Sequence, residues 1–168
     1  MAQPNLNALM RFLGQMSDTD GVSDTDLNFV CREQNDAMVA NGFYDEPHEV
    51  STRLMLTVSE LAEACEADRK ERHANYEAFN DALARIANHL DTEVEHGAVS
   101  PTSAAEEFRK EYDRLFKEHI KDTYEDEIAD TYIRLLDLCG HQHLNIDRAI
   151  LLKRLYNKHR PYKHGKGY

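Results

Sequence analysis

Apolar residues recur at helical spacing along most of the chain, and this pattern restricts the fold more than any other feature. Spacings of three and four residues place side chains on one helix face, which is stable when it is buried against another helix. No stretch alternates apolar and polar residues in the way that predicts a β-strand. The sequence therefore predicts an all-α bundle. The periodic segments are Leu6–Met16, Leu27–Met38, about 48–72, Tyr76–Val94, Phe108–His119, about 122–140 and 146–160.

Polar residues and glycines at the segment borders predict helix ends. Ser23 is predicted to cap the helix that contains Leu27–Met38. Thr102 or Ser103 is predicted to cap the helix that follows the break at 96–101. Gly140 is predicted to end the helix that begins near 122.

Length and composition fit one domain of ordinary size. The chain has 168 residues, of which 41% are hydrophobic and 30% charged, which is enough for one core but not for two typical domains. No apolar run reaches the roughly 18 residues needed to cross a bilayer, and the start of the chain lacks the basic and apolar parts of a secretion signal. Cys31, Cys65 and Cys139 are widely spaced, which disfavours disulfides and a thiolate zinc site. We therefore expect residues 1–168 to form a single cytoplasmic domain without a membrane partner.

Two pairs of carboxylates, three residues apart in each pair, form the candidate functional site. Glu60 and Glu63 lie in one predicted helix, and Glu127 and Asp130 lie in another. Residues at i and i+3 share a helix face, with Cβ atoms roughly 5–6 Å apart, so two packed antiparallel helices would bring the four carboxylates together. Their mutual repulsion is costly unless a cation or protons offset it. Ligation by oxygen alone favours Mg²⁺ or Mn²⁺ over iron or zinc.

The position of the first pair on its helix favours a functional role. Glu60 and Glu63 share a helix stripe with Leu56 and Ala67, which is unusual for glutamates on a purely solvated face. The same helix carries a second stripe that is also predicted to face inward, formed by Val50, Leu54, Val58, Leu61 and Cys65.

The second pair has two interpretations. It begins a polar strip that continues through Arg134 to Asp137. An intrahelical salt-bridge ladder through Arg134 explains this strip without any metal, and both interpretations stay open.

Charge is distributed unevenly along the chain. The net charge of −11 argues against binding to DNA or RNA, because such binding depends on neutralising phosphates. The segment from Lys153 to Tyr168 nevertheless contains six basic residues and no acidic one. Within it Lys153, Asn157 and Arg160 share one helix face, and two cations with an amide suit phosphate oxygens. A solvated basic terminus explains the same charges equally well.

Four segments together resemble the MazG-like all-α nucleoside triphosphate pyrophosphohydrolases. Their sequences are SELAEA (Ser59–Ala64), EDEIAD (Glu125–Asp130), RLLDL (Arg134–Leu138) and KRLYNKHRPYKHGK (Lys153–Lys166). The resemblance implies a four-helix core that binds Mg²⁺ and cleaves a nucleotide between its α and β phosphates. It implies that the metal ligands and catalytic residues are Glu60, Glu63, Glu127 and Asp130. The phosphate-binding residues that it implies are Lys153, Asn157, Arg160, Lys163, His164 and Lys166.

The spacing of the two acidic pairs departs from the family pattern. Glu63 and Glu127 are 64 positions apart, which is longer than compact members of the family allow. Residues from about 73 to 121 are therefore expected to form an inserted helical pair.

The main functional hypothesis is a Mg²⁺-dependent enzyme that hydrolyses (d)NTP to (d)NMP and pyrophosphate, in a nucleotide-pool housecleaning role. Phosphoanhydride cleavage requires neutralised charge and an activated water, which a metal and a carboxylate can supply. One alternative is a pyrophosphohydrolase of another nucleotide, such as phosphoribosyl-ATP. Another is a non-catalytic helical interaction protein with a degenerate metal site. The apolar faces and the resemblance predict a homodimer or a higher homo-oligomer.

Overall fold

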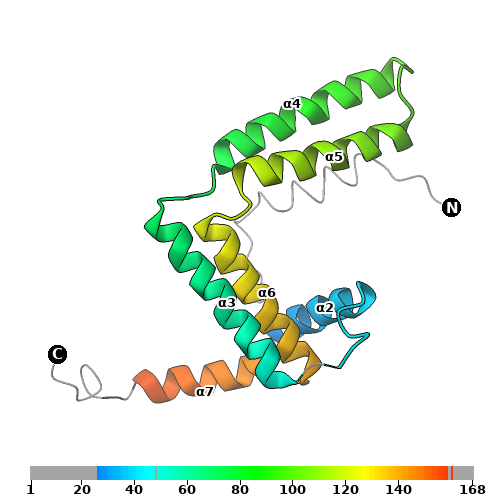
Figure 1. Cartoon of the computed structure of the whole chain (residues 1–168). Helices are drawn as coiled ribbons and strands as arrows, with labels where there is room; N and C mark the ends of the chain where they lie inside the picture. Colours follow the sequence, from blue (N-terminus) through cyan, green and yellow to red (C-terminus); the bar gives the residue numbers. More distant parts are fainter. Residues whose placement is uncertain (1–25, 48, 159, 161–168) are drawn as a thin grey trace. The chain divides into compact units, whose positions relative to one another are not determined.

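The computed structural model describes residues 26–47, 49–158 and 160, and within them it contains six α-helices and no β-strand (Figure 1). The helices are α2 (Leu27–Ala40), α3 (Val50–Arg69), α4 (Tyr76–Glu95), α5 (Pro101–His119), α6 (Tyr124–His141) and α7 (Ile146–Lys158). The prediction of an all-α protein is confirmed, whereas the MazG-like four-helix core stays a prediction. The helix predicted at Leu6–Met16 lies outside the described residues, as does Ser23. The prediction of Ser23 as the cap of α2 is wrong, because the cap is Asp26, whose carboxylate accepts a hydrogen bond from the Asn28 backbone N–H at 2.9 Å. None of the described helices has the length and apolar character needed to cross a membrane.

The chain divides into two compact units. The hairpin unit contains Glu60–Ala129, and the α7 unit contains the described residues of Ser23–Ser59 and Asp130–Tyr168. Both borders fall inside helices, so α3 and α6 each contribute to both units. The prediction of one domain over residues 1–168 stays a prediction.

The helical pair expected between about 73 and 121 is present as the α4–α5 hairpin. One apolar cluster joins Leu90 of α4 to Phe108 of α5, each 2% exposed. Two alanines, Ala87 and Ala104, are buried in the same cluster, where their small side chains suit a close approach of the two helices. A second cluster lies near the base of the hairpin and contains Phe79, Leu115 and Ile120. The hairpin therefore has an apolar core of its own.

Helix α5 begins earlier than predicted. The Ser100 side chain accepts a hydrogen bond from the Ser103 backbone N–H at 3.2 Å, and Pro101 occupies the first helical turn. The prediction of Thr102 or Ser103 as the cap is therefore wrong. Proline suits the first helical position because its fixed φ is already helical and the N–H that it lacks would be unpaired there.

Gly140 does not end α6, which continues to His141. A Cβ atom at position 140 would lie 2.2 Å from the backbone oxygen of Cys31 in α2 and 2.8 Å from the Cβ of Asn35. The predicted helix stop is wrong, and the glycine instead allows the backbones of α2 and α6 to approach closely.

A buried polar network holds α2, α3 and α6 together in the α7 unit. Asp137 is 4% exposed and accepts hydrogen bonds from Asn35 Nδ2 and Tyr44 Oη, each at 2.8 Å. Arg53 Nη1 lies 3.7 Å from Asp137, and its guanidinium lies 3.8 Å from the centroid of the Tyr44 ring. Burial, reinforced by the hydrogen bond to Asp137, raises the pKa of Tyr44 to about 12. Asp137 thus has partners from distant parts of the chain, and a ladder within α6 is not needed to explain it.

The apolar stripe of α3 that was predicted to face inward is open to solvent. Cys65 of this stripe is exposed. The other four residues are 41 to 50% exposed, namely Val50, Leu54, Val58 and Leu61. The periodicity of α3 therefore identifies an apolar face correctly, but the described part of the chain does not cover that face.

Candidate metal centre

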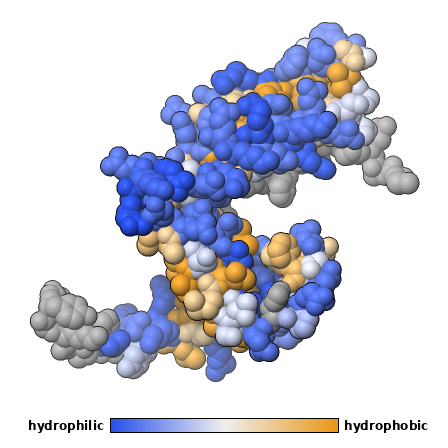
Figure 2. All heavy atoms as spheres, viewed as in Figure 1, coloured by the Kyte–Doolittle hydropathy of each residue, from blue (hydrophilic) through white to orange (hydrophobic). Residues whose placement is uncertain are grey.

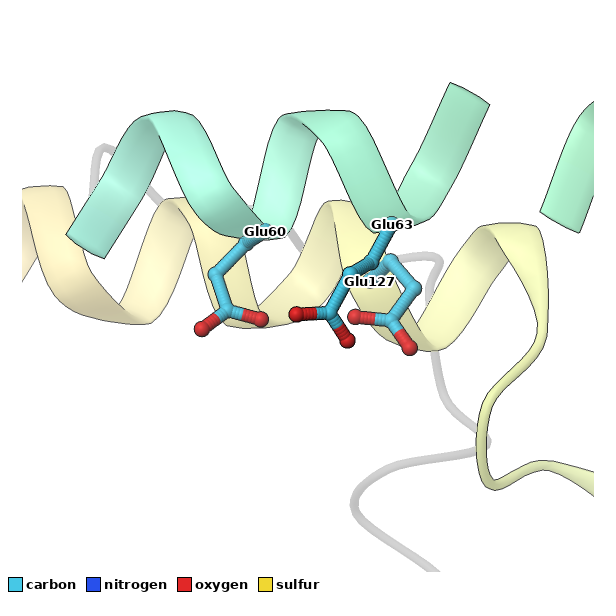
Figure 3. A group of neighbouring side chains, drawn as sticks. All are labelled: Glu60, Glu63 and Glu127. Atoms are coloured by element: carbon cyan, nitrogen blue, oxygen red, sulfur yellow. The ribbon is translucent and has the colours of Figure 1, made fainter. Parts of the chain in front are cut away.

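Three of the four predicted carboxylates meet on one side of α3 and α6 (Figure 3). Glu60, Glu63 and Glu127 each offer one oxygen, and these oxygens lie within 4.8 Å of one another. All three residues belong to the hairpin unit. Glu60 and Glu127 are buried, at 7% and 5% exposure, whereas Glu63 is exposed. The cluster thus combines two buried carboxylates with one that a ligand from solvent can reach.

Contacts at the start of α6 hold it beside the end of α3. The backbone N–H of Tyr124 donates to the carbonyl oxygen of Arg72 at 2.9 Å. The Glu125 carboxylate accepts from the backbone N–H of Ala74 at 2.9 Å and lies 3.1 Å from His73 Nδ1. These contacts set the register in which Glu127 of α6 faces Glu60 and Glu63 of α3.

Two side-chain hydrogen bonds fix the first turn of α6, which contains Glu127. The Thr123 hydroxyl accepts from the backbone N–H of Asp126 at 3.4 Å, and the Asp126 carboxylate accepts from the backbone N–H of Asp122 at 2.9 Å. These side chains thus satisfy backbone N–H groups that the start of a helix leaves without intrahelical partners.

The geometry of the three carboxylates fits a small divalent cation. Mg²⁺ binds oxygen at about 2.1 Å, so two of its ligands lie at most about 4.2 Å apart. The 4.8 Å limit on the spacing of the carboxylate oxygens is slightly larger, and small side-chain rotations would close the difference. Two unit charges at this spacing repel by roughly 3 kcal/mol at an effective dielectric constant of 20. A divalent cation would convert this repulsion into attraction.

A second acidic group, which the sequence does not single out as a site, adjoins the first. Asp122, Asp126 and Glu127 also offer oxygens within 4.8 Å of one another. Asp126 caps the start of α6, and Asp122 is paired with Lys121 Nζ at 2.9 Å. These contacts explain Asp122 and Asp126 as parts of the helix start, so we assign the metal role to the first group.

The fourth predicted ligand, Asp130, belongs to neither group. It is half-buried and has a polar interaction. Its role as a metal ligand stays a prediction.

The predicted phosphate-binding residues that the structure describes are exposed on and after α7. Lys153 Nζ lies 5.2 Å and Arg160 Cζ lies 5.7 Å from the centroid of the Tyr156 ring, so both cations lie close to one aromatic ring. Asn157 is exposed on the same helix, and α7 ends at Lys158. The other predicted phosphate ligands, Lys163, His164 and Lys166, lie outside the described residues.

The resemblance to the MazG-like enzymes rests on the residues and motifs quoted above. Comparisons with protein-family models, with curated proteins and with solved structures found no match to this chain.

Proposed function

We propose that this protein is a Mg²⁺-dependent pyrophosphohydrolase that converts (d)NTP to (d)NMP and pyrophosphate. The observation that supports the proposal is the meeting of Glu60, Glu63 and Glu127 from two helices within 4.8 Å. Mg²⁺ is usually bound by a few carboxylates together with substrate phosphates and water. Three carboxylates leave coordination positions for both.

The reaction requires neutralised phosphate charge and an activated water molecule. A bound Mg²⁺ would supply the charge neutralisation. Glu63 is the exposed member of the cluster, and we assign to it the acceptance of a proton from the attacking water. The water oxygen bonds to the α-phosphorus, the bond from that phosphorus to the bridging oxygen breaks, and pyrophosphate leaves with the electron pair.

The basic residues of the C-terminal segment are proposed to bind the phosphates. Lys153 and Arg160 carry positive charges close to the Tyr156 ring, and Asn157 adds an amide donor. Charge-assisted hydrogen bonds from such groups to phosphate oxygens are about twice as strong as neutral ones. Lys163, His164 and Lys166 are proposed to extend this phosphate-binding set.

The test uses the full chain, Mg²⁺, and a panel of NTPs, dNTPs and phosphoribosyl-ATP. We expect pyrophosphate and nucleoside monophosphate as products, and we expect EDTA to abolish their formation. Glu60→Gln should lower the rate by about a hundredfold or more, as loss of a key electrostatic group does in other enzymes. Glu66→Gln is the matched control, because Glu66 lies on the same helix outside the acidic groups and pairs with Arg69 and Lys70.

Each outcome has a definite meaning. Equal rates for Glu60→Gln and Glu66→Gln, or release of orthophosphate with nucleoside diphosphate, would refute the assignment. Hydrolysis of phosphoribosyl-ATP alone would show that the protein is a pyrophosphohydrolase of that nucleotide and not of (d)NTPs. Absence of any turnover, together with a melting temperature that Mg²⁺ does not change, would favour the non-catalytic interaction protein.

A further inference from the structure

Cys31 of α2 and Cys139 of α6 are neighbours in the α7 unit, although 108 positions separate them in the sequence. Two cavities of this unit show their proximity. One cavity has a volume of about 290 Å³ and the other about 250 Å³, and Cys31 and Cys139 are the two residues that line both. The two cysteines therefore form the wall between the cavities.

The backbones of α2 and α6 meet at the same point. A Cβ added to Gly140, the residue after Cys139, would lie 2.8 Å from the backbone carbonyl carbon of Cys31. With standard bond lengths, the Cα atoms of Gly140 and Cys31 are therefore at most about 6 Å apart. Disulfide partners have Cα atoms about 4.4–6.8 Å apart. The two helices thus approach closely enough at this point for a disulfide to link them.

The two thiols also interact directly. Burial raises the pKa of Cys31, and the neighbouring Cys139 thiol raises it further through its charge and a hydrogen bond. Burial raises the pKa of Cys139 as well, while the hydrogen bond with Cys31 lowers it. Both residues are free thiols in the structure, with Cys31 buried and Cys139 half-buried. The pair is therefore reduced, and each sulfur has the other beside it.

We propose that Cys31 and Cys139 are a modification site, which a hydroperoxide oxidises to a reversible disulfide between α2 and α6. The Cys139 thiol gives up its proton, its sulfur attacks a peroxide oxygen and the O–O bond breaks. Cys139 becomes a sulfenic acid, and the hydroxide that leaves takes up the proton to form water. The Cys31 thiol then gives up its proton, its sulfur attacks the Cys139 sulfur, and the S–O bond breaks to release a second water. The two thiols lose two electrons, which the peroxide gains.

The larger cavity gives the peroxide a route to Cys139. Its volume of about 290 Å³ is several times the roughly 30 Å³ that one water molecule occupies in the liquid. Its lining includes the polar side chains of Asn28, Arg32 and His143, which suit a small polar reagent. Cys31 also lines this cavity but is only 1% exposed. Cys139 is therefore the thiol that meets the peroxide first, and Cys31 is the thiol that completes the disulfide.

The α7 unit has little core of its own, so a covalent link between its helices has a large effect. Among its described hydrophobic residues only Cys31 and Leu138 are buried. Figure 2 shows apolar side chains at the surface, over the part of α3 and α6 that belongs to this unit. A disulfide that closes a long loop stabilises a protein by restricting its unfolded chain. In a reducing compartment such a disulfide is transient and senses oxidants. The proposal does not depend on the proposed enzymatic activity.

The test uses Cys65→Ser, which removes the exposed third thiol and leaves the pair. The variant is treated with an equimolar amount of hydrogen peroxide at about pH 9, where more of each buried thiol is ionised. Free thiols are then labelled with iodoacetamide in urea. Mass spectrometry should show the loss of two hydrogens, no label, and a digest peptide that joins Cys31 to Cys139. The Tm should rise by roughly 5–15 °C, and dithiothreitol should reverse every change.

The matched control carries Cys31→Ser in the same background and so leaves Cys139 without its partner. Peroxide should give this control no linked peptide and no rise in Tm. The wild type keeps the test decisive if the control fails to fold, because its thiols should fall from three to one with Cys31 joined to Cys139. Thiols that stay unoxidised would overturn the proposal. So would a sulfinic acid at Cys139 beside a free Cys31, or a link that forms only in urea.

Discussion

Gly140→Ala tests the close approach of α2 and α6 in the α7 unit. In an isolated helix, replacing glycine by alanine stabilises by about 1 kcal/mol, because alanine is the better helix former. In this protein the new Cβ would lie 2.2 Å from the Cys31 backbone oxygen and 2.8 Å from the Asn35 Cβ, although real Cβ contacts are essentially never shorter than 3.0 Å. The structure therefore predicts that Gly140→Ala destabilises this protein.

The magnitude follows from which atoms are too close. The nearest atom belongs to the backbone and cannot rotate away, so α2 must move by about 0.8 Å to reach the 3.0 Å minimum. Overpacking of this kind costs about 1–3 kcal/mol, and we expect the upper end because the movement also displaces Asn35, a donor to Asp137. Alanine recovers about 1 kcal/mol because it is the better helix former. The net loss in the free energy of unfolding should therefore be about 2 kcal/mol. In a chain of this size that corresponds to a fall in Tm of about 4–8 °C.

Urea denaturation followed by circular dichroism measures this loss. Gly97→Ala is the control, because position 97 has a φ of +69° and no atom within 4 Å of the added Cβ. Gly97→Ala should therefore lower the free energy of unfolding only through the strain of a left-handed backbone, by about 1 kcal/mol. A Gly140→Ala variant at least as stable as the wild type would refute the close approach.

Three further predictions concern stability. Asp137→Asn should lower the free energy of unfolding by about 3 kcal/mol in urea denaturation, because Arg53 loses its buried charged partner; a loss below about 1 kcal/mol would contradict the network. Ser100→Ala should lower the free energy of unfolding by about 1 kcal/mol, and Thr102→Ala should lower it clearly less. A larger loss for Thr102→Ala than for Ser100→Ala would instead support Thr102 as the cap. Since the pKa of Tyr44 is raised from 10 to about 12, its stabilising contribution is complete below pH 10 and is lost as the pH rises through 12. The free energy of unfolding should then fall more steeply over that range in the wild type than in Tyr44→Phe.

Helical periodicity predicts the elements of this chain well, because spacing along a helix is a local property. It identifies α4 and α5 and the apolar residues that join them, such as Leu90 and Phe108. It also identifies the apolar stripe of α3, but not what covers that stripe. Val50 and Leu54 belong to the stripe and are 41% and 45% exposed. Burial depends on a packing partner, and a spacing pattern contains no information about that partner.

The candidate site shows the same division between local and long-range information. The i, i+3 spacing predicts that Glu60 and Glu63 share a helix face. The meeting with Glu127 depends on the register of α6 against α3, which is set by contacts such as the Tyr124 N–H to the Arg72 oxygen. The partners of Asp137 could not be predicted either, because Asn35 and Tyr44 lie 102 and 93 residues away in the sequence.

Binding of Mn²⁺ is the most direct test of the metal centre, since Mn²⁺ prefers the same oxygen ligands as Mg²⁺. Electron paramagnetic resonance measures the free Mn²⁺ that remains in solution with the protein. We predict that the wild type depletes the free Mn²⁺ signal and that added Mg²⁺ restores it. Glu60→Gln should weaken binding by about tenfold or more, and Glu66→Gln should bind as the wild type does. A wild type that leaves the Mn²⁺ signal unchanged, or a Glu60→Gln variant that depletes it equally, would contradict the metal centre.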